Sequence, residues 1–235
     1  MSTHTRIFHV TTILLLSFCL ARAEDPVRFG IRVGMDLGYL SLPNDTWQDD
    51  SALHQSPIKG LIVGAFFQAR ISSLAYFVPQ LVYIHKGTRV HNISFDAYPN
   101  GHYMYIPRGS IQIDAEYIEL STKFMSKFGW EGFNIYPNIG PLIGINLSSQ
   151  TTYEYSTGTT PTSIVTVKQN KYTTPIEIAL EIGIAAEIMP SQKTSYVLNW
   201  NYSFGLTNYA GVSGFPQGNA LFQGSQISLG MSFAL

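Results

Sequence analysis

The sequence predicts an all-β fold, an antiparallel up-and-down transmembrane β-barrel of about eight strands preceded by a cleaved signal peptide. Three observations carry this prediction. Large apolar side chains alternate with glycine, polar or charged ones in most segments, and the connections between these segments alternate between short and long. In addition, only 12% of the 235 residues are charged, whereas 13% are aromatic. That composition indicates a surface that does not need water.

The first 23 residues have the pattern of a secretory signal peptide. Arg6 supplies a positive charge, residues 13–20 are apolar except for Ser17, and Ala21 and Ala23 form the small-x-small pattern that precedes a cleavage site. We therefore expect the mature chain to begin at Glu24. The predicted organisation is a signal peptide over residues 1–23 and one barrel domain over residues 24–235.

Cys19 is the only cysteine and lies inside this predicted signal peptide. Acylation of Cys19 would make the chain a lipoprotein, but Phe18 stands where that reaction favours a small residue. A mature chain without thiols has neither disulfides nor a cysteine nucleophile.

The two ends of the predicted mature chain are strands with a period of two. From Phe29 to Tyr39, large apolar groups occupy the odd positions, and Gly, Arg32 or Asp36 occupy the even ones. Residues 226–235 repeat the pattern and place Phe233 near the end of the chain. A helix could not segregate this pattern onto two faces. A terminal amphipathic strand with an aromatic residue resembles the assembly signal of outer-membrane barrels.

Six further strands are expected between these ends, at about residues 59–71, 74–86, 112–125, 133–148, 176–188 and 196–206. Short turns are expected at residues 72–73, 127–132 and 190–193. Longer polar loops are expected at residues 41–57, 87–111, 149–172 and 208–221. Short turns at one end and long loops at the other are typical of outer-membrane barrels, in which the long loops are extracellular and the termini periplasmic.

The polar face of the strands is rich in glycine and carries charges of both signs. A narrow lumen needs small side chains because those of all strands converge there, whereas a solvent-facing surface does not. This favours a membrane barrel, with apolar groups outside and polar groups inside, over a soluble lipocalin-like barrel. The predicted lumen charge network consists of Arg32, Asp36, Lys59, Arg70, Glu119, Lys123, Glu177, Glu181 and Glu187.

Several phrases of the chain resemble the PorT-type outer-membrane β-barrel family of Gram-negative bacteria. They are residues 30–37, 60–66, 79–83 followed by Lys86 and Gly87, 117–120 with Lys123, 140–144, and 202–208. Ser121 and Gln80 depart from the pattern, where a proline and an acidic residue are usual. The resemblance implies the fold and an outer-membrane location. It implies little chemistry, although one branch of the family is linked to protein secretion.

The charged lumen has two interpretations. It could form a selectivity ring or proton-linked network in a narrow pore. Alternatively, it could be a structural ion-pair plug, as in small barrels that resemble the OmpA membrane domain. An interior of eight strands is just wide enough to be filled by its own side chains, which favours the plug.

No catalytic, metal or cofactor site is predicted. His54, His85, His91 and His102 lack the spacing typical of metal ligands, and no G-x-S-x-G phrase occurs. The loops are rich in Tyr, Asn, Ser, Thr and Gly, for example residues 98–105 and 151–155, which suits surface recognition but is also ordinary for external loops.

Three classes of function remain. The first is a structural, surface-interaction or envelope-complex barrel, the second is a narrow passive pore for small solutes or ions, and the third is a periplasmic lipocalin-like ligand-binding barrel. The expected partners are outer-membrane lipids, the barrel-assembly machinery during biogenesis, and an envelope or surface protein. A net charge of −1 gives no reason to expect nucleic acid, and a monomeric barrel is expected.

Overall fold

The computed structural model describes residues 27–41, 54–97, 104–155, 163–168, 174–189, 191–208 and 221–235. The predicted signal peptide, with Ala21, Ala23 and Glu24, lies outside these residues, as does His102. The strands are β1 Arg28–Ser41, β2 His54–Arg70, β3 Ala75–Ala97, β4 Met104–Ser126, β5 Phe128–Trp130, β6 Phe133–Tyr155, β7 Ser163–Lys168, β8 Ile176–Ile188, β9 Thr194–Gly205 and β10 Leu221–Ala234. No helix of the described residues is long and apolar enough to cross a membrane.

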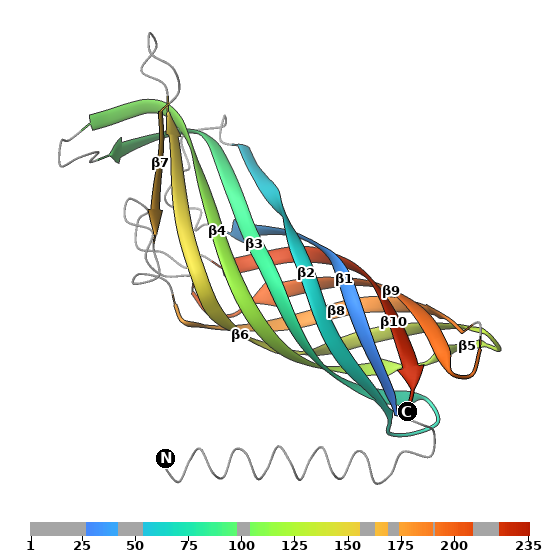
Figure 1. Ribbon diagram of the computed structural model, residues 1–235. Coiled ribbons are helices and arrows are strands. Elements are labelled where there is room, and N and C mark those ends of the chain that lie inside the picture. The colour runs from blue at the N-terminus through green and yellow to red at the C-terminus, as the bar shows by residue number, and fades with distance from the viewer. Residues whose placement is uncertain are drawn as a thin grey trace, which may run out of the picture.

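Eight of these strands close into an antiparallel up-and-down barrel, which confirms the predicted fold class. Their order is β4-β3-β2-β1-β10-β9-β8-β6, and the pairing of β4 with β6 closes the ring (Figure 1). The first and last strands pair along their full length, from Arg28 opposite Ala234 to Ser41 opposite Leu221. A closed ring leaves none of these eight strands with a free edge inside the wall.

The two remaining strands extend members of the ring. β5 continues β4 in the same register against β6, since Met125 lies opposite Asn138 and Phe128 lies opposite Ile135. The break between β4 and β5 faces Pro137, which has no N–H to donate to the ladder. Half of the predicted turn at residues 127–132, namely Phe128–Trp130, is therefore strand. β7 forms a hairpin with β6.

We call the two ends of the barrel the turn end and the loop end. The turn end carries the connections around residues 71–74, 131–132 and 189–193, together with the start of β1 and the end of β10. At the loop end, β3, β4 and β6 run well beyond their predicted limits, to Ala97, from Met104 and to Tyr155. Much of the two loops predicted at residues 87–111 and 149–172 is thus strand. These extensions and β7 form a sheet that projects from the ring (Figure 1).

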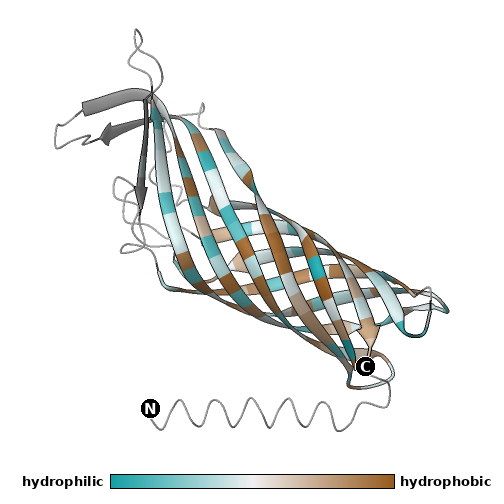
Figure 2. Cartoon of the chain, viewed as in Figure 1, coloured by the Kyte–Doolittle hydropathy of each residue, from teal (hydrophilic) through white to brown (hydrophobic). Residues whose placement is uncertain are grey.

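The outer face of the wall is apolar, and alternate residues point into the lumen. In β8, whose exposure alternates along the strand, Ile176 and Ile182 are 50% and 48% exposed, whereas Glu177 and Glu181 are 5% and 1% exposed. The same inversion holds in β1, where Ile31 is exposed and Arg32 is buried. Figure 2 shows the resulting alternation of hydrophobic and hydrophilic residues along the strands. A soluble barrel has the opposite arrangement, so the chain is a membrane-type barrel and the lipocalin-like alternative does not fit.

Aromatic and polar side chains border the apolar surface at both ends. At the turn end, Phe128 and Trp130 of β5 are 61% and 71% exposed. At the loop end, the hydroxyls of Tyr39 and Tyr202 lie 3.0 Å apart on the outer face, and both donate to Gln223 Oε1, at 3.4 and 3.2 Å. Aromatic residues with a polar group are typical of the membrane–water interface.

A polar cluster on the outer face of β3 and β4 also limits the apolar surface at the loop end. His85 Nε2 lies 3.2 Å from Asp114 Oδ1, Arg89 Nε donates to Gln112 Oε1 at 3.0 Å, and Gln112 Nε2 donates to Asp114 Oδ2 at 2.9 Å. Because these side chains hydrogen-bond to one another, they can lie on the outer face rather than in the lumen. They lie at the height along the barrel axis where the apolar outer surface ends.

Candidate functional site: a filled lumen

The middle of the lumen holds a layer of charged side chains from four strands. Arg32 and Asp36 come from β1, Lys86 from β3, Glu119 and Lys123 from β4, and Glu177 and Glu181 from β8. Each is at most 5% exposed. Their strands place them inside because each occupies the inward phase of the two-residue repeat. We call these seven side chains the charged layer.

Lys86 is the central cation of the charged layer. Its Nζ lies 2.5 Å from Glu119 Oε1 and 2.9 Å from Glu177 Oε1, and it also donates to Glu177 Oε2 at 3.0 Å. The ammonium group further lies 5.3 Å from the centre of the Tyr117 ring. It thus ties β3 to β4 and β8 across the lumen. An uncompensated charge at this depth would be very costly.

A second ion pair joins β4 to β8 nearer the turn end. Lys123 Nζ lies 3.4 Å from Glu181 Oε2, and both side chains are 1% exposed. Arg32 interacts electrostatically with Glu181 and with Glu119, and so links the two ion-pair groups. Asp36 Oδ2 accepts a hydrogen bond of 2.9 Å from Gly38 N, and Asp36 interacts electrostatically with Lys86. The charges therefore form one connected network.

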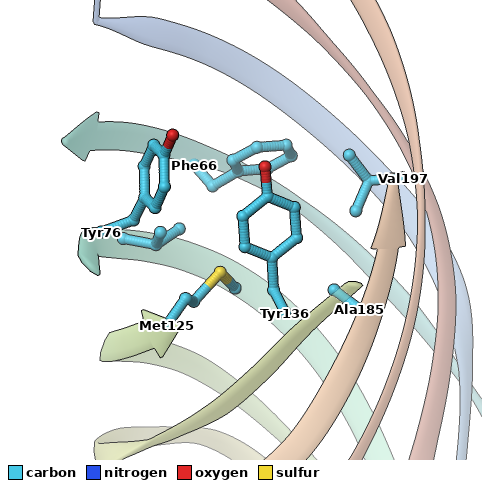
Figure 3. Close-up of a cluster of buried hydrophobic side chains, with 7 residues drawn as sticks. Phe66, Tyr76, Met125, Tyr136, Ala185 and Val197 are labelled. Atoms are coloured by element: carbon cyan, nitrogen blue, oxygen red, sulfur yellow. The ribbon is translucent and has the colours of Figure 1, made fainter. Parts of the chain in front are cut away.

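The lumen contains an apolar plug between the charged layer and the turn end. It consists of Phe66, Tyr76, Val78, Met125, Tyr136, Ala185 and Val197 (Figure 3). The rings of Tyr76 and Tyr136 meet edge to face, with centroids 5.6 Å apart. These side chains come from six strands around the ring, so they fill the cross-section by ordinary packing.

Glu187 lies beside the plug and is held by neutral donors. Tyr136 Oη donates to Glu187 Oε2 at 2.6 Å, and Asn134 Nδ2 donates to the same oxygen at 3.4 Å. Glu187 is 2% exposed. With Glu187 included, the described part of the lumen holds three buried cations, Arg32, Lys86 and Lys123, and five buried acidic side chains. The interior is therefore formally acidic.

Two residues of the predicted charge network lie elsewhere. Lys59 is exposed and lies opposite Leu37, on the outward phase of β2, so it does not face the lumen. Its position near the loop end of β2 lets the ammonium group reach water. Arg70 is the last residue of β2, and its Nε donates to Ser72 O at 3.0 Å in the turn that follows. The other predicted members lie in the charged layer or, for Glu187, beside the plug.

Sequence reasoning missed Lys86, which lies at the centre of the network. It occurs at the end of the third predicted strand and was noted only as part of the family resemblance. The signal was available, because Lys86 shares the even positions of β3 with the inward residues Val82 and Ile84. The tyrosine and asparagine that hold Glu187 carried no such signal. Hydrogen bonds across a barrel depend on strand register, which one sequence does not reveal.

The described residues contain no group of three or more His, Cys, Asp or Glu side chains that could hold a metal ion. His85 is engaged with Asp114, and His91 Nε2 lies 3.3 Å from Ser56 Oγ. His54 lies opposite His91 in the β2–β3 ladder.

No protein-family model matches the chain, and no curated protein matches it. Several solved structures of bacterial surface proteins are similar to it. Neisserial surface protein A is 9% identical, with 89% of this chain and 97% of that chain covered and a TM-score of 0.44. Ail, the attachment invasion locus protein of Yersinia pestis, is 10% identical, with 88% and 99% covered and a TM-score of 0.41. The outer membrane protein OprG from Pseudomonas aeruginosa is 9% identical, with 91% and 99% covered and a TM-score of 0.36. The strand ladders of this chain themselves define the closed barrel.

Proposed function

We propose that this chain is a non-enzymatic, monomeric barrel of the outer membrane of a Gram-negative bacterium, with its loop end outside the cell. Its role is structural or interactive: the ring anchors and rigidifies the sheet that projects from the loop end. The observation that carries this proposal is the filled lumen, in which a charged layer and an apolar plug occupy successive levels of the interior. A barrel filled in this way can bind a partner on its surface but has no open path for solutes through its lumen.

The projecting sheet offers a surface suited to a protein partner. Among the described strands, β7 pairs with β6 alone, so its other edge carries backbone groups that can pair with an added strand. The hydroxyls of Thr152 and Thr166 lie 3.2 Å apart on the β6–β7 hairpin. An envelope or surface protein is the partner class that fits this edge. The phrases that resemble the PorT-type family support an envelope-complex role within the same proposal.

A narrow cation-preferring pore is the second candidate. The excess of carboxylates over cations in the lumen favours it, because a water-filled path lined by Glu177, Glu181 and Glu187 would attract cations. The apolar plug argues against it. This candidate requires Phe66, Met125 and Tyr136 to leave the cross-section that they fill together.

Labelling of single cysteines in intact cells tests the proposed location and orientation. Thr166→Cys, on the β6–β7 hairpin, and Gln192→Cys, in the turn between β8 and β9, both replace exposed side chains. With a membrane-impermeant maleimide, we expect Thr166→Cys to react in intact cells and Gln192→Cys only after lysis. Labelling of Gln192→Cys alone would reverse the orientation, and equal labelling of both in intact cells would contradict a membrane-spanning wall.

A further inference from the structure

The described ladders of the wall are interrupted at several places, and three of these lie at a proline, namely Pro79, Pro137 and Pro141. The longest break in the β2–β3 ladder lies nearer the loop end, between the Pro57–Thr88 and Ile62–Ile84 pairs. In the β2–β3 ladder, Phe66 pairs with Gln80 and Ala69 pairs with Phe77, but the two intervening pairs are missing. Pro79 lies in this gap, opposite Phe67. In the β4–β6 ladder, the pairs between Ser121–Leu142 and Phe124–Ile139 are missing, and Pro141 lies there. The β1–β2, β1–β10, β9–β10 and β8–β9 ladders are continuous.

The missing N–H of Pro79 explains the first gap. Ile71 N donates to Ala75 O in the turn that joins β2 to β3, and Lys127 N donates to Leu74 O on the other side. Odd-numbered residues of β3 therefore direct their backbone groups toward β2. A residue other than proline at position 79 would donate to Phe67 O. Proline cannot, so the β2–β3 seam lacks this bond.

A small cavity lies within the apolar plug, and one side of it is the β2–β3 seam at Pro79. Its volume is about 20 Å³, which is enough for about one water-sized group. Phe66 and Gln68 of β2 and Val78 and Gln80 of β3 form the side of the cavity at the seam, and the other lining residues come from β1, β4, β6, β8 and β9. The missing hydrogen bond of Pro79 therefore lies in the part of the wall that borders the cavity.

Three residues that line the cavity each carry a buried polar atom without a hydrogen-bond partner: Arg32 Nε, Gln80 Oε1 and Glu187 Oε1. Their side chains are 5%, 5% and 2% exposed. The guanidinium nitrogen is a donor, whereas the amide and carboxylate oxygens are acceptors. A hydroxyl group matches this set, because it can accept from Arg32 and donate to Gln80 or Glu187. An anionic group would be repelled by Glu187, and a cationic group by Arg32.

The outer side of the gap is apolar and aromatic. Phe67, opposite Pro79, is 45% exposed, and its ring lies 5.2 Å from that of Phe29. On the far side of Pro79, the rings of Phe77 and Phe124 lie 5.6 Å apart. A neutral molecule dissolved in the bilayer would therefore reach the gap without meeting a charge.

We propose that the β2–β3 seam at Pro79 is a lateral entrance through which small neutral molecules bearing a hydroxyl group pass from the bilayer to the lumen cavity. The hydroxyl could belong to water or to an alcohol carried by the membrane. This proposal rests on the membrane location proposed above. It differs from a pore because the path crosses the wall rather than running along the barrel axis.

Cysteine labelling across the seam tests the proposal. Val78→Cys faces the cavity, and the chain is used in a Cys19→Ser background so that it carries one thiol. In liposomes, we expect the small uncharged reagent methyl methanethiosulfonate to modify Val78→Cys and a charged trimethylammonium analogue to leave it unmodified. Adding Pro79→Val restores the missing N–H and should slow the modification about fivefold. Pro141→Val, which restores the N–H at a ladder break away from the cavity, is the matched control and should leave the rate unchanged.

Three further observations separate the outcomes. Val63→Cys lies on the exposed outer face. The uncharged reagent should modify it and the charged analogue should not, and rapid modification by the charged analogue would contradict the membrane location itself. A Val78→Cys that stays unmodified while Val63→Cys reacts would overturn the entrance, as would an unchanged rate in Pro79→Val. Protection of Val78→Cys by 1-butanol would identify a membrane-borne alcohol as the occupant, and labelling without protection would identify water.

Discussion

The charged layer and the apolar plug fill the same lumen by different means. In the charged layer, Lys86 and Lys123 compensate carboxylates from other strands at 2.5–3.4 Å. In the plug, aromatic and aliphatic side chains fill the space by contact, and Glu187 is the acidic group at its border. In the charged layer, a charge can be removed without a large loss of stability only if its partner is removed as well. In the apolar plug, the stability depends on the volume of the side chains.

Because different interactions hold the two regions together, substitutions in them should destabilise the barrel in different ways. Removing one member of an ion pair leaves a charge in a space without water, and the whole network must then rearrange. Removing a methylene group from the plug leaves a void whose cost depends on its size. The loss of unfolding free energy caused by substitutions in each region therefore shows whether ion pairing or side-chain packing holds that part of the lumen closed.

The largest effect is expected at Lys86. Lys86→Met removes the cation that Glu119 and Glu177 share, so two buried carboxylates remain near each other. We expect the free energy of unfolding in detergent micelles to fall by about 3–5 kcal/mol. Urea titration followed by gel mobility of the folded and unfolded forms measures it. The triple variant Lys86→Met, Glu119→Gln, Glu177→Gln should recover most of the loss. A triple variant as unstable as the single one would show that charge compensation is not what holds this layer.

The plug should respond to lost volume at Met125. Met125→Ala leaves a void among Phe66, Val78 and Tyr136, and we expect a loss of about 2–5 kcal/mol of unfolding free energy. Met125→Leu, which keeps the volume, is the control and should cost less than about 1.5 kcal/mol. Equal losses in the two variants, measured by the same titration, would mean that packing does not govern this region.

A smaller effect is expected where the two regions meet. Tyr136→Phe keeps the ring in the plug but removes the hydroxyl that donates to Glu187 at 2.6 Å. We expect a loss of about 1–3 kcal/mol, because the carboxylate loses a donor inside the barrel. Adding Glu187→Gln to Tyr136→Phe should reduce this loss. If the two changes were simply additive in equilibrium unfolding, Tyr136 and Glu187 would not act as a pair.

The smallest effect is expected at Lys59, which belongs to neither region. Lys59→Ala removes an exposed outward side chain, and we expect the unfolding free energy to change by no more than about 0.5 kcal/mol. The same measurement serves as a baseline for the lumen variants. A loss comparable to that of Lys86→Met would place Lys59 back in the network.

The wall of the barrel could be predicted closely from the sequence because it follows from a local period. The alternation in residues 176–188 already separates inward glutamates from outward isoleucines. The sequence predicts shorter strands at the loop end than β3, β4 and β6 have, because their polar loop-end residues no longer alternate with lipid-facing groups. These extensions are held by ladder pairs and by side-chain contacts between neighbouring strands, for example between Arg89 and Gln112, and a single sequence does not show these contacts.

The lumen could be predicted only in part, because its contacts join distant strands. Membership of the charged layer follows from strand phase, which was assigned correctly for Glu119 and Glu181 but not for Lys59. The partner of each charge depends on the register of strands such as β3 and β8, which are far apart in sequence. The plug was missed because its residues, such as Met125 and Val197, have the same composition as the lipid-facing surface. Only the phase of their strands directs them inward.

Single-channel conductance in a planar bilayer tests the central claim, that the lumen is closed, most directly. The protein would be inserted only after heat-modifiable gel mobility has shown that it is folded. We predict a silent barrel, and brief openings with a preference for cations only when Phe66, Met125 and Tyr136 are all replaced by alanine. Steady openings of the unaltered protein that lose their cation preference in Glu177→Gln or Glu181→Gln would contradict the account and establish a narrow pore.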